Sequence, residues 1–151
     1  MGRDLMKLLN SILLCLAVSA CTSSTSLEPQ NTLRDPGVAR LHFIRPSTIV
    51  GALQSIRVTL NGTKIGNLGV GTNLYVDRAP GTYNVVIDTE FDLGRWEQTI
   101  SAPLKKEYYF KIAPGSISVI SVGTTAAVSG SMSVTAISES EGKALIEAQN
   151  D

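Results

Sequence analysis

The sequence is poor in the residues from which reactive centres are usually built. Its 151 residues include two cysteines, one histidine and one tryptophan. A single histidine leaves a catalytic triad or a zinc site dependent on partners that no motif marks. Lys plus Arg and Asp plus Glu are equal at 13 each, so nothing on the chain attracts nucleic acid. We therefore expect no metal, no cofactor and no nucleic-acid partner.

The sequence also lacks an apolar run long enough to cross a membrane. Apart from Cys15, only the segment from Ile12 to Val18 is free of polar residues, whereas a spanning helix needs about 20 apolar residues. Arg3 and Lys7 precede an apolar stretch that ends in small residues, which is the order of parts in a secretory signal. Residues 1–20 are thus expected to form a signal helix that targets the chain.

The leader ends in Val18-Ser19-Ala20-Cys21, which resembles the bacterial lipobox. The resemblance implies a diacylglycerol thioether on Cys21, cleavage after Ala20 and acylation of the new terminus. Two acyl chains are enough for stable membrane anchoring. Thr22 stands where an aspartate commonly signals inner-membrane retention, so we expect the outer membrane. The alternative is a secreted soluble protein in which Cys21 is incidental.

Processing at this site would leave the exported chain without a free thiol. Cys15 is removed with the leader and Cys21 carries lipid, so no disulfide or metal-thiolate site can form. Residues 21–36 are rich in Ser, Thr and other polar residues, which is typical of a flexible tether. The folded domain is expected to cover residues 37–137, and residues 138–151 a short helix and tail.

The domain shows the period-two alternation of half-buried strands, interrupted by Gly, Pro and Asn. This pattern predicts an all-β fold, most simply an antiparallel β-sandwich of immunoglobulin-like or transthyretin-like type, with a barrel as the alternative. A further strand through 126–128 is left open. The predicted strands are 39–44, 55–60, 63–68, 74–77, 83–87, 96–100, 108–112, 117–122 and 132–137.

Two turns and one helix start have recognisable chemistry. Asn61-Gly62 supplies the positive φ angles of a type I′ hairpin. Pro80-Gly81 fits a type II turn with Gly81 at positive φ, which predicts another hairpin. Ser138 and Glu141 match a capping box, followed by a helix to about residue 149 with Leu145 and Ala148 as its apolar contacts.

Several of these motifs occur together in one family. Over residues 38–113 the chain resembles bacterial lipoproteins that carry a β-rich domain of unknown function, although Ile44 replaces the family's usual aromatic before Arg45-Pro46. The resemblance implies a fold and an envelope location, and it implies no reaction. It is carried by the strings Ala39-Arg40-Leu41-His42-Phe43-Ile44-Arg45-Pro46, Ile56-Arg57-Val58-Thr59-Leu60-Asn61-Gly62, Ile65-Gly66-Asn67-Leu68 and Ala79-Pro80-Gly81-Thr82-Tyr83.

Besides Cys21, two residues are candidate contacts for a ligand or partner. His42 is the only histidine, although a lone strand histidine is usually structural or solvated. Arg45, at a strand end before Pro46, could present its planar guanidinium to a carboxylate or phosphate group. An ion pair with a neighbouring acid is the plainer interpretation of Arg45.

The sequence as a whole predicts a lipid-anchored envelope protein that acts as a non-catalytic binding or structural module. Its membrane contact is the acylated Cys21, and other envelope proteins are candidate partners. One alternative is a subunit of an envelope assembly, and an unpaired edge strand would support this alternative. Another is a carboxylate-dependent hydrolase, which would have to gather His42 or Arg45 with acids such as Asp77, Asp88 or Asp92.

Overall fold

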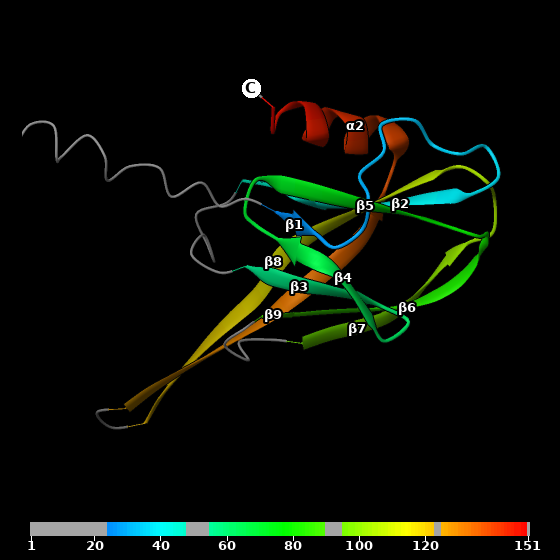
Figure 1. Cartoon of the computed structure of the whole chain (residues 1–151). Coiled ribbons are helices and arrows are strands. Elements are labelled where there is room, and N and C mark those ends of the chain that lie inside the picture. The colour runs from blue at the N-terminus through cyan, green and yellow to red at the C-terminus, as the bar shows by residue number, and fades with distance from the viewer. Residues whose placement is uncertain (1–23, 48–54, 90–94, 123–124, 151) are drawn as a thin grey trace, which may run out of the picture.

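The computed structural model describes residues 24–47, 55–89, 95–122 and 125–150, and for residues 116–122 and 125–131 it describes the backbone alone. Cys21, Asp92 and the leader lie outside these ranges. The described part forms two packed β-sheets and one short helix (Figure 1). The strands are β1 (Thr25–Ser26), β2 (Ala39–Arg45), β3 (Ile56–Leu60), β4 (Thr63–Leu68), β5 (Thr72–Arg78), β6 (Gly81–Thr89), β7 (Arg95–Ala102), β8 (Glu107–Val122) and β9 (Thr125–Ile137), and the helix is α2 (Glu139–Glu147).

The first sheet has the strand order β1-β4-β3-β6-β7, and the second has β5-β2-β8-β9. Neighbouring strands run antiparallel except β2 and β8, which are parallel. The prediction of a purely antiparallel sandwich is therefore wrong at this pair. All the strands of the first sheet except β1 lie between β2 and β8 in the sequence. Since no hairpin joins β2 to β8, their relative direction is not set by a turn.

The β3–β4 hairpin confirms the predicted turn. Leu60 pairs with Thr63, and the two residues between them have φ angles of 48° at Asn61 and 80° at Gly62. Positive φ at both central positions is the signature of a type I′ turn. The Asn61 side chain also accepts a hydrogen bond from the backbone N–H of Asn84 on β6, which ties the turn to the next strand.

The hairpin predicted at Pro80-Gly81 does not form. Strand β5 pairs with β2 in the second sheet, whereas β6 pairs with β3 and β7 in the first. Among the described residues, Gly81 is not one of the glycines with positive φ, and it begins β6. The connection therefore carries the chain from one sheet to the other, and the Tyr83 hydroxyl braces it by donating to the Ala79 carbonyl.

The C-terminal strands form one long hairpin. The separate strands predicted at 108–112 and 117–122 are a single strand, β8, whose pairing with β9 shifts register between Pro114 and Ile117. The optional strand at 126–128 is part of β9. Beyond Pro114, where its register with β9 shifts, β8 continues with β9 as a two-stranded arm that projects from the sandwich (Figure 1).

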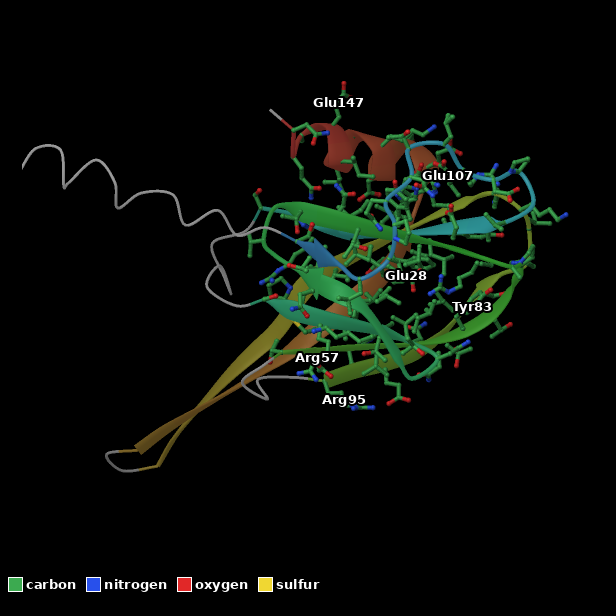
Figure 2. All side chains as sticks on the ribbon, in the orientation of Figure 1. Glu28, Arg57, Tyr83, Arg95, Glu107 and Glu147 are labelled. Carbon is green, nitrogen blue, oxygen red and sulfur yellow. The ribbon has the colours of Figure 1, made fainter. Side chains whose placement is uncertain are left out.

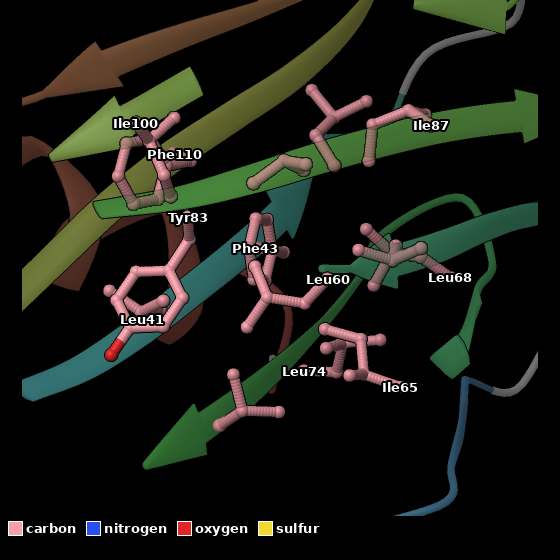
Figure 3. Packing of buried hydrophobic residues seen from close by; sticks show 14 of the residues in the cluster. Leu41, Phe43, Leu60, Ile65, Leu68, Leu74, Tyr83, Ile87, Ile100 and Phe110 are labelled. Atoms are coloured by element: carbon pink, nitrogen blue, oxygen red, sulfur yellow. The ribbon is translucent and has the colours of Figure 1, made fainter. Parts of the chain in front are cut away.

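The core lies between the two sheets, where alternate residues of each strand meet (Figure 3). Each large apolar side chain buried there contributes about 1.5–3 kcal/mol through its removal from water. Phe110 belongs to this core and Trp96 packs against it, as the alternation predicts. The largest fully buried side chains are Phe43, Leu41, Ile44, Ile56, Ile65, Leu68, Leu74, Ile87, Ile112, Val58, Val76 and Val85.

Helix α2 packs on the outer face of the second sheet. Ser138 is its N-cap and accepts a hydrogen bond from the Glu141 backbone N–H at 3.2 Å, which is the serine half of the predicted capping box. The predicted apolar contact of Ala148 is wrong because this residue is exposed, whereas Leu145 is half-buried and Gly142 is buried. No helix within the described ranges is long and apolar enough to span a membrane.

The stretch that precedes the sandwich makes contacts of its own. Strand β1 pairs with β4, and Glu28 forms an ion pair with Arg78. Arg34 donates hydrogen bonds to the backbone carbonyls of Val38 and Lys105. Residues 24–36 belong to the segment for which the sequence predicts a flexible tether. In the structure they lie along the edges of the sandwich.

Candidate functional site

A pocket of about 420 Å³ lies between α2 and the outer face of the second sheet. Its volume falls within the range of pockets that hold small organic ligands. Figure 2 shows two of its residues, Glu107 and Glu147, on the side of the molecule that carries the helix. The lining residues are Thr32, Arg40, His42, Asn73, Tyr75, Glu107, Tyr109, Lys143, Ile146, Glu147 and Asn150.

Strand register gathers the polar side chains of the pocket into two rows. His42 on β2 stands opposite Tyr75 on β5 and Tyr109 on β8, so three rings lie side by side across three strands. Two residues earlier on β2, Arg40 stands opposite Asp77 and Glu107. Because side chains two apart point to the same face of a strand, both rows face the helix.
 His42 is held between the two tyrosine rings and is buried, with 8% of its surface exposed. Its ring stacks on Tyr109 at 4.5 Å and 4°, and lies 5.5 Å from the Tyr75 ring at a tilt of 50°. Burial lowers the pKa of His42 to about 4, although the charge of Glu107 works in the opposite direction. The imidazole is therefore neutral at pH 7, with one N–H donor and one acceptor nitrogen.

Neither ring nitrogen of His42 has a hydrogen-bond partner among the described residues. The nearest acid, Glu107, has its Oε2 atom 3.6 Å from Nε2, which is beyond an ordinary hydrogen bond. An unpaired buried polar group costs about 1–3 kcal/mol. The pocket is thus lined by a side chain whose donor and acceptor nitrogens have no partner and are themselves shielded from solvent.

Arg40, in contrast, has a hydrogen-bond partner on each of its three nitrogens. Its Nε and Nη2 atoms donate to the two carboxylate oxygens of Asp77 at 2.7 and 2.8 Å, and Nη1 donates to the Thr32 carbonyl at 3.2 Å. The guanidinium carbon lies 4.2 Å from the centre of the Tyr75 ring. These bonds lower the pKa of Asp77 and raise that of Arg40. Arg40 therefore orders this face, and its positive charge is balanced by the carboxylate of Asp77.

Glu107 remains a carboxylate at the centre of the site. Burial favours its neutral form, but the hydrogen bond from the Tyr109 hydroxyl and the nearby positive charges outweigh burial and lower its pKa. Burial, followed by this same hydrogen bond, raises the pKa of Tyr109. The negative charge of Glu107 is thus fixed in place at neutral pH.

Helix α2 forms one wall of the pocket, at a position fixed by a glycine. A Cβ atom on Gly142 would overlap the Cδ1, Cγ and Cβ atoms of Tyr109, so only glycine allows the helix this close. Lys111 on β8 forms an ion pair with Glu141 at 2.7 Å. At the other end of the helix, Gln149 donates to the Arg45 carbonyl and accepts from the Asn73 side chain.

The structure places the two predicted contact residues differently. His42 lies in the pocket, whereas the Arg45 side chain is buried at the end of β2 and donates to the Leu68 carbonyl at 3.1 Å. Of the acids in the hydrolase hypothesis, Asp77 lies beside this site, but Asp88 pairs with Arg57 on the first sheet. Asp92 and Cys21 fall outside the described residues.

Sequence reasoning missed Arg40, Tyr75, Glu107 and Tyr109 as partners of His42. Their shared feature is an outward position on adjacent strands, which would be visible only once the parallel pairing of β2 with β8 was known. Within the described ranges, no three His, Cys, Asp or Glu side chains lie close enough to hold a metal ion.

Comparisons of the chain with protein-family models, with curated proteins and with solved structures find no match. The resemblance to bacterial lipoproteins with a β-rich domain accordingly remains an expectation from the motifs. The functional argument therefore starts from the pocket itself.

Proposed function

We propose that this chain is a lipid-anchored bacterial envelope protein whose sandwich is a non-catalytic module that binds a small polar ligand beneath α2. The supporting observation is the buried His42, whose two nitrogens lack partners in a pocket of about 420 Å³. The anchor in this proposal is Cys21 at the lipobox-like sequence, with the outer membrane as the expected location.

Binding is favoured over catalysis by the surroundings of His42. Within the part of the chain that the structure describes, its ring nitrogens contact no hydroxyl or thiol that could act as a nucleophile. Its flat faces are occupied by tyrosine contacts. Nucleophilic catalysis requires a base in hydrogen-bond reach of the attacking group. The arrangement instead presents fixed polar atoms and aromatic surface, as recognition sites do.

Of the two sandwich types that the sequence leaves open, we propose the transthyretin-like one. An immunoglobulin sandwich places its first two strands in the same sheet. Here β2 and β3, the first two strands after the short β1, belong to different sheets. The placement of β2 and β3 in different sheets therefore argues against the immunoglobulin-like arrangement.

The experiment compares small molecules retained by the detergent-solubilised full chain and by its Gly142→Ala variant, using native mass spectrometry. The variant pushes α2 away from Tyr109 and opens the pocket. We expect a discrete bound mass on the parent chain that the variant loses. Ala144→Gly, at an exposed position of the same helix, is the control for a general loss of helix stability. Equal retention by parent and Gly142→Ala would contradict the proposed site.

A second candidate function, a subunit of an envelope assembly, is favoured by the β8–β9 arm. Strand β9 is the edge of the second sheet, and the sequence has no charged residue between Lys111 and Glu139. Edge strands without charges are prone to pair with other strands. Ser129→Lys would place a charge on this edge. If β9 pairs with a strand of another molecule, Ser129→Lys should reduce the size of the solubilised assembly. A monomeric size for both the parent chain and the variant would dismiss this candidate.

A further inference from the structure

The charges around the pocket are not balanced. Its two cations are already paired with carboxylates: Arg40 with Asp77 at 2.7 Å, and Lys143 with Glu139 at 2.6 Å. The two carboxylates that line the pocket, Glu107 and Glu147, form no ion pair with any Lys or Arg of the described residues. The pocket therefore carries an excess of negative charge.

The aromatic lining adds to this preference. The faces of tyrosine rings attract cations, and Tyr75 already holds the Arg40 guanidinium at 4.2 Å. Tyr109 lines the same pocket and donates its hydroxyl proton to Glu107, which keeps the acid ionised. The acceptor nitrogen of the neutral His42 can take a hydrogen bond from an N–H group. These groups together suit a donor that carries a positive charge.

The opposite choice, an anionic ligand, would have to compete with carboxylates that already pair with both cations of the pocket. The three nitrogens of Arg40 already donate to Asp77 and Thr32, and Lys143 is held by Glu139. An anion would also have to approach Glu107 and Glu147. Like charges in a partly buried site repel one another strongly.

We propose that the pocket beneath α2 binds an organic ligand through a primary ammonium group, which lies between Glu107 and Glu147 and donates to His42. The inference rests on the proposed binding function and adds the chemical class of the ligand. It assigns to Glu147 the recognition of the ammonium group. This exposed helix residue lines the pocket, and its side chain makes no hydrogen bond with any described residue.

The test is a calorimetric titration of the solubilised full chain with three probes of similar length: putrescine, butane-1,4-diol and succinate. They carry positive charge, no charge and negative charge respectively. We expect measurable affinity for putrescine and at least tenfold weaker binding of the other two, which corresponds to about 1.4 kcal/mol. Glu147→Gln should weaken putrescine binding about tenfold.

The control variant is Glu97→Gln, which removes an exposed carboxylate that pairs with Arg95 on β7 of the first sheet. It should leave putrescine binding unchanged. Equal weakening by Glu97→Gln and Glu147→Gln would reveal a non-specific charge effect and overturn the inference. Preferential binding of the diol or of succinate would overturn the ammonium class but leave a binding pocket. Absence of binding by all three, together with no retained mass in native spectrometry, would overturn both.

Discussion

At the scale of single residues, His42 carries most of the functional argument. Its position was marked in the sequence only because it is the single histidine. The structure adds the stacking on Tyr109, the burial and the missing hydrogen bonds. A solvated strand histidine, which the sequence equally allows, would have none of these properties. Burial is the property that can be measured in the free protein.

The first prediction concerns the dependence of stability on pH. The pKa of His42 is about 4 in the folded chain, below its ordinary value of 6.5. The unfolded chain therefore binds more protons between these values, so the free energy of unfolding falls as the pH falls through this window. Between pH 7 and 5 this group should contribute a loss of about 2 kcal/mol, measured by urea unfolding.

His42→Phe removes the titrating group and keeps a flat ring for stacking on Tyr109. This variant should lose less stability between pH 7 and 5 than the parent chain. The pKa values of Asp77 and Glu107 are lowered from ordinary values of 3.8 and 4.5, so these acids contribute little to the change in stability between pH 7 and 5. Identical pH profiles for parent and variant would show that His42 is solvated.

The residues around His42 show what single-sequence reasoning can and cannot reach. Arg45 was selected because it precedes Pro46 at a strand end, and that position buries its side chain away from the pocket. Arg40 and Glu107 face each other across β2 and β8, which are more than sixty positions apart in the chain. Pairing over such a distance leaves no local pattern, so their shared site could not be predicted.

At the scale of elements, local chemistry predicted the strands and turns better than their partners. Strand β4 runs from Thr63 to Leu68, the predicted bounds, because Asn61-Gly62 sets both the turn and the register. The same logic predicts a hairpin at Pro80-Gly81. It fails because the two flanking strands belong to different sheets, and sheet membership is decided by packing across the core.

The second prediction separates these two turns. Gly62 has φ of 80°, where a β-branched side chain is strained, whereas Gly81 begins a strand and a Cβ there would meet atoms no nearer than 3.6 Å. Gly62→Val should therefore lower the free energy of unfolding by more than about 1 kcal/mol. Gly81→Val should cost clearly less. The reverse order of denaturant midpoints would contradict the turn assignment.

Helix α2 shows how an apparently unfavourable residue can be required. Gly142 weakens an isolated helix by about 1 kcal/mol relative to alanine. In the folded chain its missing side chain lets the helix contact Tyr109. The sequence revealed the helix through Ser138 and its neighbours, but the surface that it covers depends on a sheet assembled from distant strands.

At the scale of the whole molecule, the proposed function combines a membrane anchor with a sandwich that carries a pocket beneath α2. The anchor is inferred from the sequence, and the pocket from the structure. A tethered domain with an outward-facing ligand site would sample the space close to its membrane. The β8–β9 arm extends away from the sandwich and offers a separate place for contact with other proteins (Figure 1).

The third prediction tests the anchor. Cys21→Ala removes the thiol that would accept the lipid, so the chain should remain an unlabelled, uncleaved precursor in cells fed a labelled fatty acid. The parent chain should incorporate the label and fractionate with the outer membrane. Cys15→Ala, within the leader, is the matched control and should be labelled like the parent. Label on the Cys21→Ala chain, or none on the parent, would refute lipid anchoring at this cysteine.

The most direct test of the central claim, that the pocket beneath α2 is a ligand site built around a desolvated His42, is an NMR titration of the His42 imidazole in isotopically labelled full chain. The account predicts a pKa near 4 without ligand. Saturating putrescine should lower this pKa further, because a bound ammonium group opposes protonation of the ring. An imidazole that titrates near its ordinary value of 6.5, with or without putrescine, would contradict the account.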